Sequence, residues 1–178
     1  MTPRKGGPQA APKSRRTLYL VRHAIAADRG DKHPDDTKRP LTHKGITRMR
    51  QVVRGFATFN PRIDLVLTSP LVRARQTADI VMAGLSPAPS LNTFEALAPG
   101  HSPADVAQGL GAFVSRHAIA LVGHEPDLGL LAAWLIGARE PLVFKKGAIA
   151  RIDISALPPG RDGQLIWLAT PRMLRGLS

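Results

Sequence analysis

Short apolar runs alternate along this chain with longer segments in which apolar residues recur at helical spacing. The runs that predict β-strands are residues 18–21, 63–67 and 118–122. The segments that predict helices are residues 44–59, 71–83 and 128–136. Because strands that alternate with helices are typical of α/β proteins, the pattern predicts an α/β fold with a mainly parallel sheet.

The C-terminal part of the chain has a different pattern. Residues 148–154 and 165–168 are apolar runs joined by the turn-rich stretch LPPGRDGQ, which predicts a closing hairpin at the sheet edge. Earlier in the chain, Thr42 and Ser69 precede helical segments and are suitable N-cap residues, with Pro70 suited to a first helical position.

The chain has 178 residues, which is enough for one domain with its own core. It contains no cysteine, which excludes disulfides, thiolate zinc sites and cysteine nucleophiles. The first sixteen residues, MTPRKGGPQAAPKSRR, are basic and show no periodicity. We therefore expect residues 1–16 to form a disordered basic tail and residues 17–178 to form the domain.

Charge and hydropathy restrict the partners. The net charge is +12, which favours polyanions such as phosphorylated substrates, nucleic acids or anionic lipids. Aromatic residues make up only 4%, too few for base stacking, so no specific nucleic-acid partner is expected. No segment resembles a signal peptide or approaches the roughly eighteen apolar residues of a membrane span. We expect a cytoplasmic protein without a membrane partner.

Charged side chains follow three of the predicted strands. Arg22 and His23 come directly after the first strand, Arg73 lies a turn beyond the second, and His124 follows the third. The carboxyl ends of neighbouring parallel strands face a common crevice, so we expect these four side chains to converge. Taken singly, each also has an ordinary interpretation as a solvated loop or helix-surface residue.

Two arginines and two histidines suit phosphoryl chemistry. Arginine offers a fixed fork of charged donors to phosphate oxygens, and neutral imidazole is a good nucleophile near pH 7. Two arginines with a protonated second histidine would neutralise the transferred group without a metal. The remaining histidines and carboxylates lack metal-ligand spacing, so we expect a metal-independent site with no cofactor.

The motifs LYLVRHA, RPLTHKG, LTSPLVRARQTA and LVGHEPDL, in this order and spacing, resemble the histidine phosphatase superfamily, and in particular its SixA-type phosphohistidine phosphatases. The resemblance implies a three-layer sandwich of the phosphoglycerate-mutase-like type. It also implies that His23 is the nucleophile that becomes phosphorylated, and that Arg22, Arg73 and His124 bind the phosphoryl group. The third residue of the first motif is usually glycine and here is Ala24.

A general acid is harder to assign from the sequence. Larger members of this superfamily use a carboxylate to protonate an ester leaving group. Glu95 in TFEALAPG is our candidate, with Glu125 beside His124 as a second, and a solvent-exposed loop charge is the alternative for Glu95. A phosphohistidine substrate needs such an acid less, because its leaving imidazole has a pKa near neutrality.

Few residues separate Ala78 from Ala118, so little chain is available to cover the crevice. An open site suits phosphohistidine on a signalling protein, for example a histidine-phosphotransfer domain. Two alternatives remain: a phosphatase of a small phosphoester such as a sugar phosphate or nucleotide, and a non-catalytic phosphate-binding or nucleic-acid-binding module. Lys145 and Lys146 are either a source of positive potential at the crevice rim or a solvated basic pair. No apolar strip indicates an oligomer, so a monomer is favoured.

Overall fold

The computed structural model describes residues 15–178. The expected basic tail therefore lies outside the described residues except for Arg15 and Arg16. Arg16 is the first residue of the first strand, one position before the expected start of the domain. No helix in residues 15–178 is long and apolar enough to cross a membrane.

The described residues form a six-stranded sheet with the order β3-β2-β4-β1-β5-β6. Its strands are β1 (Arg16–Arg22), β2 (Leu65–Thr68), β3 (Ser90–Thr93), β4 (Ala118–Gly123), β5 (Ile149–Ile154) and β6 (Gln164–Ala169). The first four strands in this order pair in parallel, whereas β5 pairs antiparallel with both β1 and β6. The mainly parallel sheet and the closing hairpin at its edge are both confirmed.

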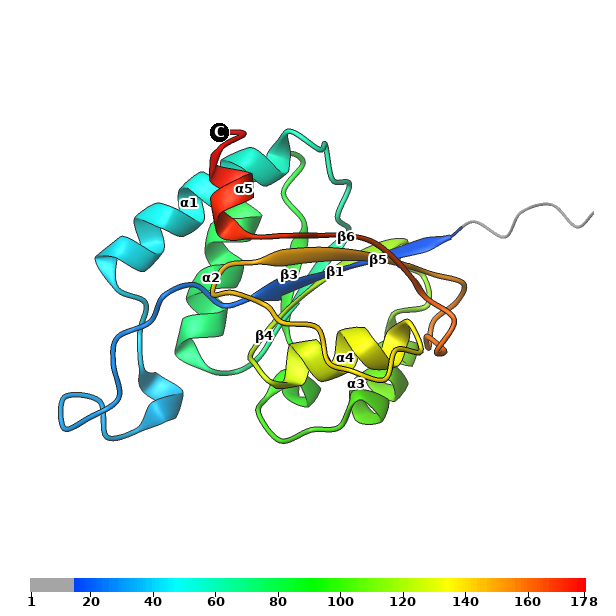
Figure 1. Cartoon of the computed structure of the whole chain (residues 1–178), viewed down its shortest axis with the longest axis horizontal. Coiled ribbons are helices and arrows are strands. Elements are labelled where there is room, and N and C mark those ends of the chain that lie inside the picture. Colours follow the sequence, from blue (N-terminus) through cyan, green and yellow to red (C-terminus); the bar gives the residue numbers. More distant parts are fainter. Residues whose placement is uncertain (1–14) are drawn as a thin grey trace, which may run out of the picture.

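Helices cover both faces of the sheet (Figure 1). One face carries α1 (His43–Ala57), α2 (Val72–Ala83) and α5 (Pro171–Arg175), and the other carries α3 (Pro103–Gly109) and α4 (Asp127–Leu135). Successive side chains of β1 point to opposite faces of the sheet. Tyr19 and Val21 belong to the core under α1 and α2, while Leu18 and Leu20 belong to the core under α4. The expected three-layer sandwich is confirmed.

The register of the central strands brings their carboxyl ends level. Arg22 pairs with Gly123 between β1 and β4, and Thr68 pairs with Val122 between β2 and β4. The residues that come next along each strand therefore emerge at one edge of the sheet, as the parallel arrangement predicts.

The structure confirms one of the predicted helix starts and contradicts the other. The Thr42 side chain accepts a hydrogen bond of 2.9 Å from the amide of Gly45 and caps α1, as predicted. The prediction for Ser69 and Pro70 is wrong, because α2 begins at Val72 and has no side-chain cap. Ser69 is instead fully buried at the end of β2, where its hydroxyl faces His124.

Residues between α2 and β4 form elements that the apolar pattern does not show. They are β3, α3 and two 3-10 helices, η2 (Glu95–Leu97) and η3 (Leu110–Phe113). A third 3-10 helix, η1 (Asp36–Lys38), lies in the polar segment between β1 and α1. Asp35 caps η1 by accepting a hydrogen bond of 3.0 Å from the amide of Thr37.

Candidate active site

A cleft of about 410 Å³ opens at the carboxyl ends of β1, β2 and β4. Four of the predicted site residues line it, namely Arg22, His23, Arg73 and His124. The parallel sheet therefore brings together side chains that lie about a hundred positions apart in the chain. Glu95 is exposed on η2 and is not among the residues that line this cleft.

His23 is buried, with its ring held by the backbone of the following residue. Its Nδ1 lies 2.7 Å from the carbonyl oxygen of Ala24, and because a carbonyl only accepts, Nδ1 must carry the proton. The Ala24 amide in turn donates to Thr77 Oγ1 at 3.0 Å. Burial lowers the pKa of His23 to about 4, and the charges of Arg73 and Arg22 act in the same direction. The ring is thus neutral at pH 7, with its lone pair on Nε2.

His124 lies beside His23, with 5.1 Å between the ring centroids. Its Nε2 is 2.8 Å from Ser69 Oγ, and its buried Nδ1 has no hydrogen-bond partner among the described residues. Burial lowers the pKa of His124 to about 3, helped by His23 and Arg73. In this structure the second histidine is therefore neutral at pH 7, whereas the sequence led us to expect a protonated ring.

Arg22 and Arg73 each keep part of their guanidinium group unbonded. Arg22 Nη1 donates to the carbonyl of Phe144 at 2.5 Å, and Arg73 Nη1 donates to the carbonyl of Asp36 at 2.7 Å. The Nε atoms of both arginines are buried without a partner among residues 15–178. Because buried N–H groups are normally paired, these donors indicate a site for an anionic acceptor.

Asp36 organises the arginines on one side of the cleft. Its carboxylate lies 3.0 Å from Arg73 Nη2, 3.0 Å from Arg39 Nη2 and 2.9 Å from Arg29 Nε. Burial raises the pKa of Asp36, but the charges of Arg73 and Arg39 and the hydrogen bond from Arg29 outweigh it, so that the pKa lies below its ordinary value. The sequence reasoning missed Asp36, Arg39 and Arg29. Arg39 is the first residue of the RPLTHKG motif, and this position is the signal by which the sequence could have identified it.

Two carboxyl groups that line the cleft are candidates for proton transfer. Glu125 Oε1 accepts a hydrogen bond of 2.6 Å from the amide of Phe144, which occupies that oxygen. Asp127, which the sequence reasoning also missed, has a buried Oδ2 without a partner among the described residues. Burial raises the pKa of both carboxyl groups. The geometry favours Asp127 over Glu95 as a proton donor.

Within residues 15–178, no group of three or more histidine, aspartate or glutamate side chains could hold a metal ion. The functional groups that the cleft does offer are guanidinium donors, the ammonium group of Lys146, two neutral imidazoles and three carboxyl groups. This set can bind a phosphoryl group and attack it.

Comparisons with known proteins agree with this chemistry. Residues 18–98 match the model of the histidine phosphatase superfamily (branch 1). An uncharacterized protein of Picosynechococcus sp. strain PCC 7002 is 37% identical over 171 residues, which cover 88% of this chain and 98% of that protein. The phosphohistidine phosphatase SixA of Escherichia coli K12 is 28% identical over 160 residues, which cover 89% and 96%.

The fold agrees as well. The structure of the protein histidine phosphatase SixA complexed with tungstate matches with a TM-score of 0.77 and 26% identity, over 88% of this chain and 97% of that one. The expected phosphoglycerate-mutase-like sandwich is thereby confirmed. With Arg22, His23, Arg73 and His124 of the LYLVRHA, LTSPLVRARQTA and LVGHEPDL motifs gathered in one cleft, this chain belongs to the histidine phosphatase superfamily and is a phosphatase.

Proposed function

We propose that this phosphatase removes the phosphoryl group from phosphohistidine on a signalling protein, through a phosphohistidine formed on its own His23. The observation that carries the proposal is the tautomer of His23. Its Nδ1 proton is held by the Ala24 carbonyl, so a neutral Nε2 lone pair is available in a cleft rich in arginine.

In the first step, Nε2 of His23 attacks phosphorus, and a new P–N bond forms as the bond to the substrate imidazole breaks. The electron pair of the breaking bond stays on the leaving nitrogen, which takes up the proton of the Asp127 carboxyl group. Arg22 and Arg73, which line the cleft, bind the equatorial oxygens through N–H groups of their guanidinium ions. The dianion also raises the pKa of His124, because nearby negative charge favours the protonated ring, which then donates to a phosphoryl oxygen.

In the second step, a water oxygen attacks the phosphohistidine on the face opposite Nε2. The P–N bond breaks, its electron pair returns to Nε2, and inorganic phosphate leaves. The water proton passes to a carboxylate that lines the cleft, and Asp127 is suited to accept it. His23 is neutral again at the end of the cycle.

Two observations support phosphohistidine as the substrate. The Escherichia coli relative and the tungstate-bound neighbour are both named as phosphohistidine or protein histidine phosphatases. Of the segment 78–118, only Pro99 and Gly100 line the cleft in the part of the chain that the structure describes. The cleft is therefore accessible to a histidine presented on a protein surface.

Mass spectrometry of the rapidly quenched enzyme tests this function. The wild type and His23→Ala are mixed with a phosphohistidine-bearing protein, with an alkaline work-up because phosphohistidine is acid-labile. We expect a phosphoryl adduct on His23 in the wild type, and neither adduct nor turnover in the variant. His117→Ala is the matched control, because His117 is exposed at the opposite end of β4. Turnover by His23→Ala at the wild-type rate would refute the mechanism.

A small phosphoester is the second candidate substrate, and Asp127 is the observation that favours it. An alkoxide leaving group needs a proton, and the raised pKa of Asp127 makes its carboxyl a better donor than an ordinary aspartate. Efficient turnover of a sugar phosphate or nucleotide, without turnover of a phosphohistidine protein, would favour this substrate class.

A further inference from the structure

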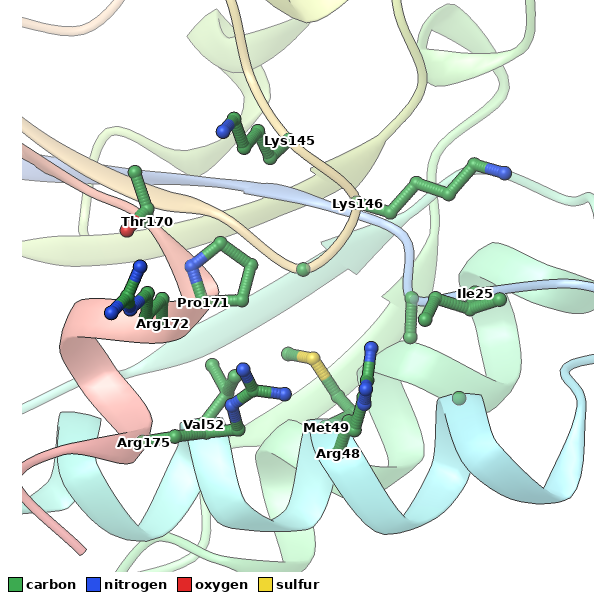
Figure 2. A pocket seen from close by; sticks show the side chains of 13 residues that line it. Ile25, Arg48, Met49, Val52, Lys145, Lys146, Thr170, Pro171, Arg172 and Arg175 are labelled. Atoms are coloured by element: carbon green, nitrogen blue, oxygen red, sulfur yellow. The ribbon is translucent and has the colours of Figure 1, made fainter.

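A second hollow, separate from the catalytic cleft, lies between α1, α5 and the segment that precedes β5 (Figure 2). Its volume is about 280 Å³. Met49 and Val52 of α1 and Pro171 of α5 give it an apolar floor. We call this hollow the basic groove.

Five cationic side chains line the basic groove, and no acidic side chain does. They are Arg48, Lys145, Lys146, Arg172 and Arg175. Figure 2 shows that they come from three separate parts of the fold, namely α1, α5 and the loop before β5. None of the five forms an ion pair with a carboxylate of residues 15–178, although six such pairs occur elsewhere in that range.

The helix dipole accounts for only part of this arrangement. Arg172 and Arg175 lie in the last turn of α5, where cations are favourable. Arg48, Lys145 and Lys146 belong to other elements, and their gathering at the same hollow adds like-charge repulsion that no neighbouring carboxylate relieves. An anionic partner would remove that repulsion.

The basic groove adjoins the catalytic cleft. Lys146 lines both hollows, and Ala24, the neighbour of His23, lines the groove. The loop that carries the two lysines is fixed to the catalytic strand, because the Gly147 amide donates to the carbonyl oxygens of Arg22 at 3.1 Å and His23 at 3.2 Å. A protein whose phosphohistidine enters the cleft would therefore place neighbouring surface over the groove.

We propose that the basic groove docks an acidic segment of the phosphorylated protein substrate, an inference that rests on the proposed function. Carboxylates of the segment pair with the five cations, and an apolar side chain of the same segment contacts Met49 and Val52. The docking selects among phosphoproteins by their surface charge, while the catalytic cleft recognises the phosphoryl group itself.

The double variant Arg48→Ala with Arg172→Ala tests the proposal and leaves Lys146 intact, because that residue also lines the catalytic cleft. Arg139→Ala with Arg161→Ala is the matched control, because both arginines are exposed and line neither hollow. Each variant is assayed with a phosphorylated histidine-phosphotransfer domain that has an acidic surface, and with free phosphohistidine.

We expect kcat/KM for the phosphoprotein to fall about tenfold in the groove variant at low salt, mainly through KM, and the difference to shrink as salt is added. Turnover of free phosphohistidine is expected to be unchanged, and the control variant should match the wild type on both substrates. An equal loss in the control, or an equal loss on free phosphohistidine, would overturn the proposal.

A binding measurement distinguishes failure of the groove proposal from failure of the proposed catalytic function. Fluorescence anisotropy with a labelled glutamate-rich peptide measures docking even in an enzyme that turns over no phosphohistidine. Weaker binding by the groove variant than by the control supports the groove in that case, while absent turnover by the wild type refutes only the proposed function. Equal peptide binding by both variants refutes the groove. The proposal would also be refuted if inositol hexakisphosphate, a small polyanion, fills the groove without inhibiting turnover of the phosphoprotein.

Discussion

His23 and Ala24 are joined by a contact that fixes the tautomer of the imidazole ring, since Nδ1 of the ring lies 2.7 Å from the carbonyl oxygen of the next residue. The contact uses only the backbone of Ala24, so alanine supplies it as well as the glycine usual at this motif position. Ala24 is itself buried, at 3% exposure, in the core under α1 and α2. The motif departure therefore leaves the orientation of His23, the proposed nucleophile, intact.

Lowering the pH tests the neutral state of this ring. Because burial lowers the pKa of His23 to about 4 and that of His124 to about 3, both rings should stay neutral at pH 6, and His23 should carry its proton on Nδ1. Long-range ¹H–¹⁵N NMR of the histidine side chains reports both properties, with His23→Gln and His124→Gln providing the assignments. A protonated His23 ring at pH 6 would contradict the expectation.

The same two histidines make stability depend on pH. Between the ordinary histidine pKa of 6.5 and the folded value of about 4, the unfolded chain binds a proton that folded His23 does not. The free energy of unfolding therefore decreases as the pH falls through this window. Between pH 7 and pH 5, the melting temperature of the wild type should fall more than that of a His23→Gln, His124→Gln double variant. An equal fall in both proteins would refute this assignment.

Asp36→Asn tests the carboxylate that joins Arg29, Arg39 and Arg73. The amide keeps the shape but loses the charge, so Arg73 is held less firmly against the cleft. We expect kcat/KM to fall on the order of 10- to 100-fold, as for other misplaced catalytic groups. Steady-state kinetics on a phosphohistidine protein measures the change.

The control for this variant is Asp35→Asn. Asp35 is adjacent and exposed, and its side chain contacts Thr37 and Lys38 but none of the three arginines. An asparagine can still accept the bond from the Thr37 amide, so activity should stay within about twofold of the wild type. Equal losses in the two variants would show that η1 matters only as a folded unit.

Asp127→Asn and Glu95→Gln compare the two candidate general acids. Asp127 lines the cleft with a buried, unpartnered Oδ2, whereas Glu95 is exposed outside it. We expect Asp127→Asn to lower turnover of an alkyl phosphoester about 100-fold, within the usual range for general acid catalysis. Glu95→Gln should have little effect. Kinetics with both a phosphoester and a phosphohistidine protein provide the measurement.

The substrate dependence of the Asp127 variant is the sharper result. An imidazole leaves more easily than an alkoxide, so in single-turnover experiments the rate of phosphoryl transfer to the enzyme should fall much less with phosphohistidine than with the ester. A loss of ester turnover in Glu95→Gln, with Asp127→Asn fully active, would restore the role expected from the sequence.

The sequence predicted the central strands and the four converging residues because their signals are local. Each strand contains a short apolar run, and parallel pairing then places the residues just beyond each run at one edge of the sheet. β3 has the sequence SLNT with a single apolar residue, and α3 and α5 have only seven and five residues, too short for a helical period to appear.

The remaining site residues depend on contacts between distant parts of the chain. Asp36 reaches Arg73, 37 positions away, and no spacing rule marks that pair. Ser69 has the same hydroxyl whether it caps a helix or contacts His124, so its residue type alone does not distinguish the two roles. Asp127 is marked by the burial of an unpaired oxygen, which only the fold creates.

Gly45→Ala tests how α1 supports the catalytic segment. Gly45 lies in the first turn of α1, where an added Cβ would overlap the carbonyl oxygen of Ile25, two residues beyond His23. The Thr42 amide also donates to that carbonyl, at 3.0 Å, so the helix start and the catalytic segment are fixed together. Because the backbone has little room to move, we expect Gly45→Ala to lower the free energy of unfolding by about 1–3 kcal/mol and to lower kcat.

Gly111→Ala is the control, because a Cβ at position 111 would meet its nearest neighbour, Pro158, at an ordinary 3.5 Å. Alanine restricts the unfolded chain more than glycine does, so this variant should be unchanged or more stable by up to about 1 kcal/mol. Urea unfolding and kcat are measured for both variants. A Gly45→Ala protein as stable and active as Gly111→Ala would show that α1 can move away from Ile25 without disturbing His23, and that the close approach does not position the proposed nucleophile.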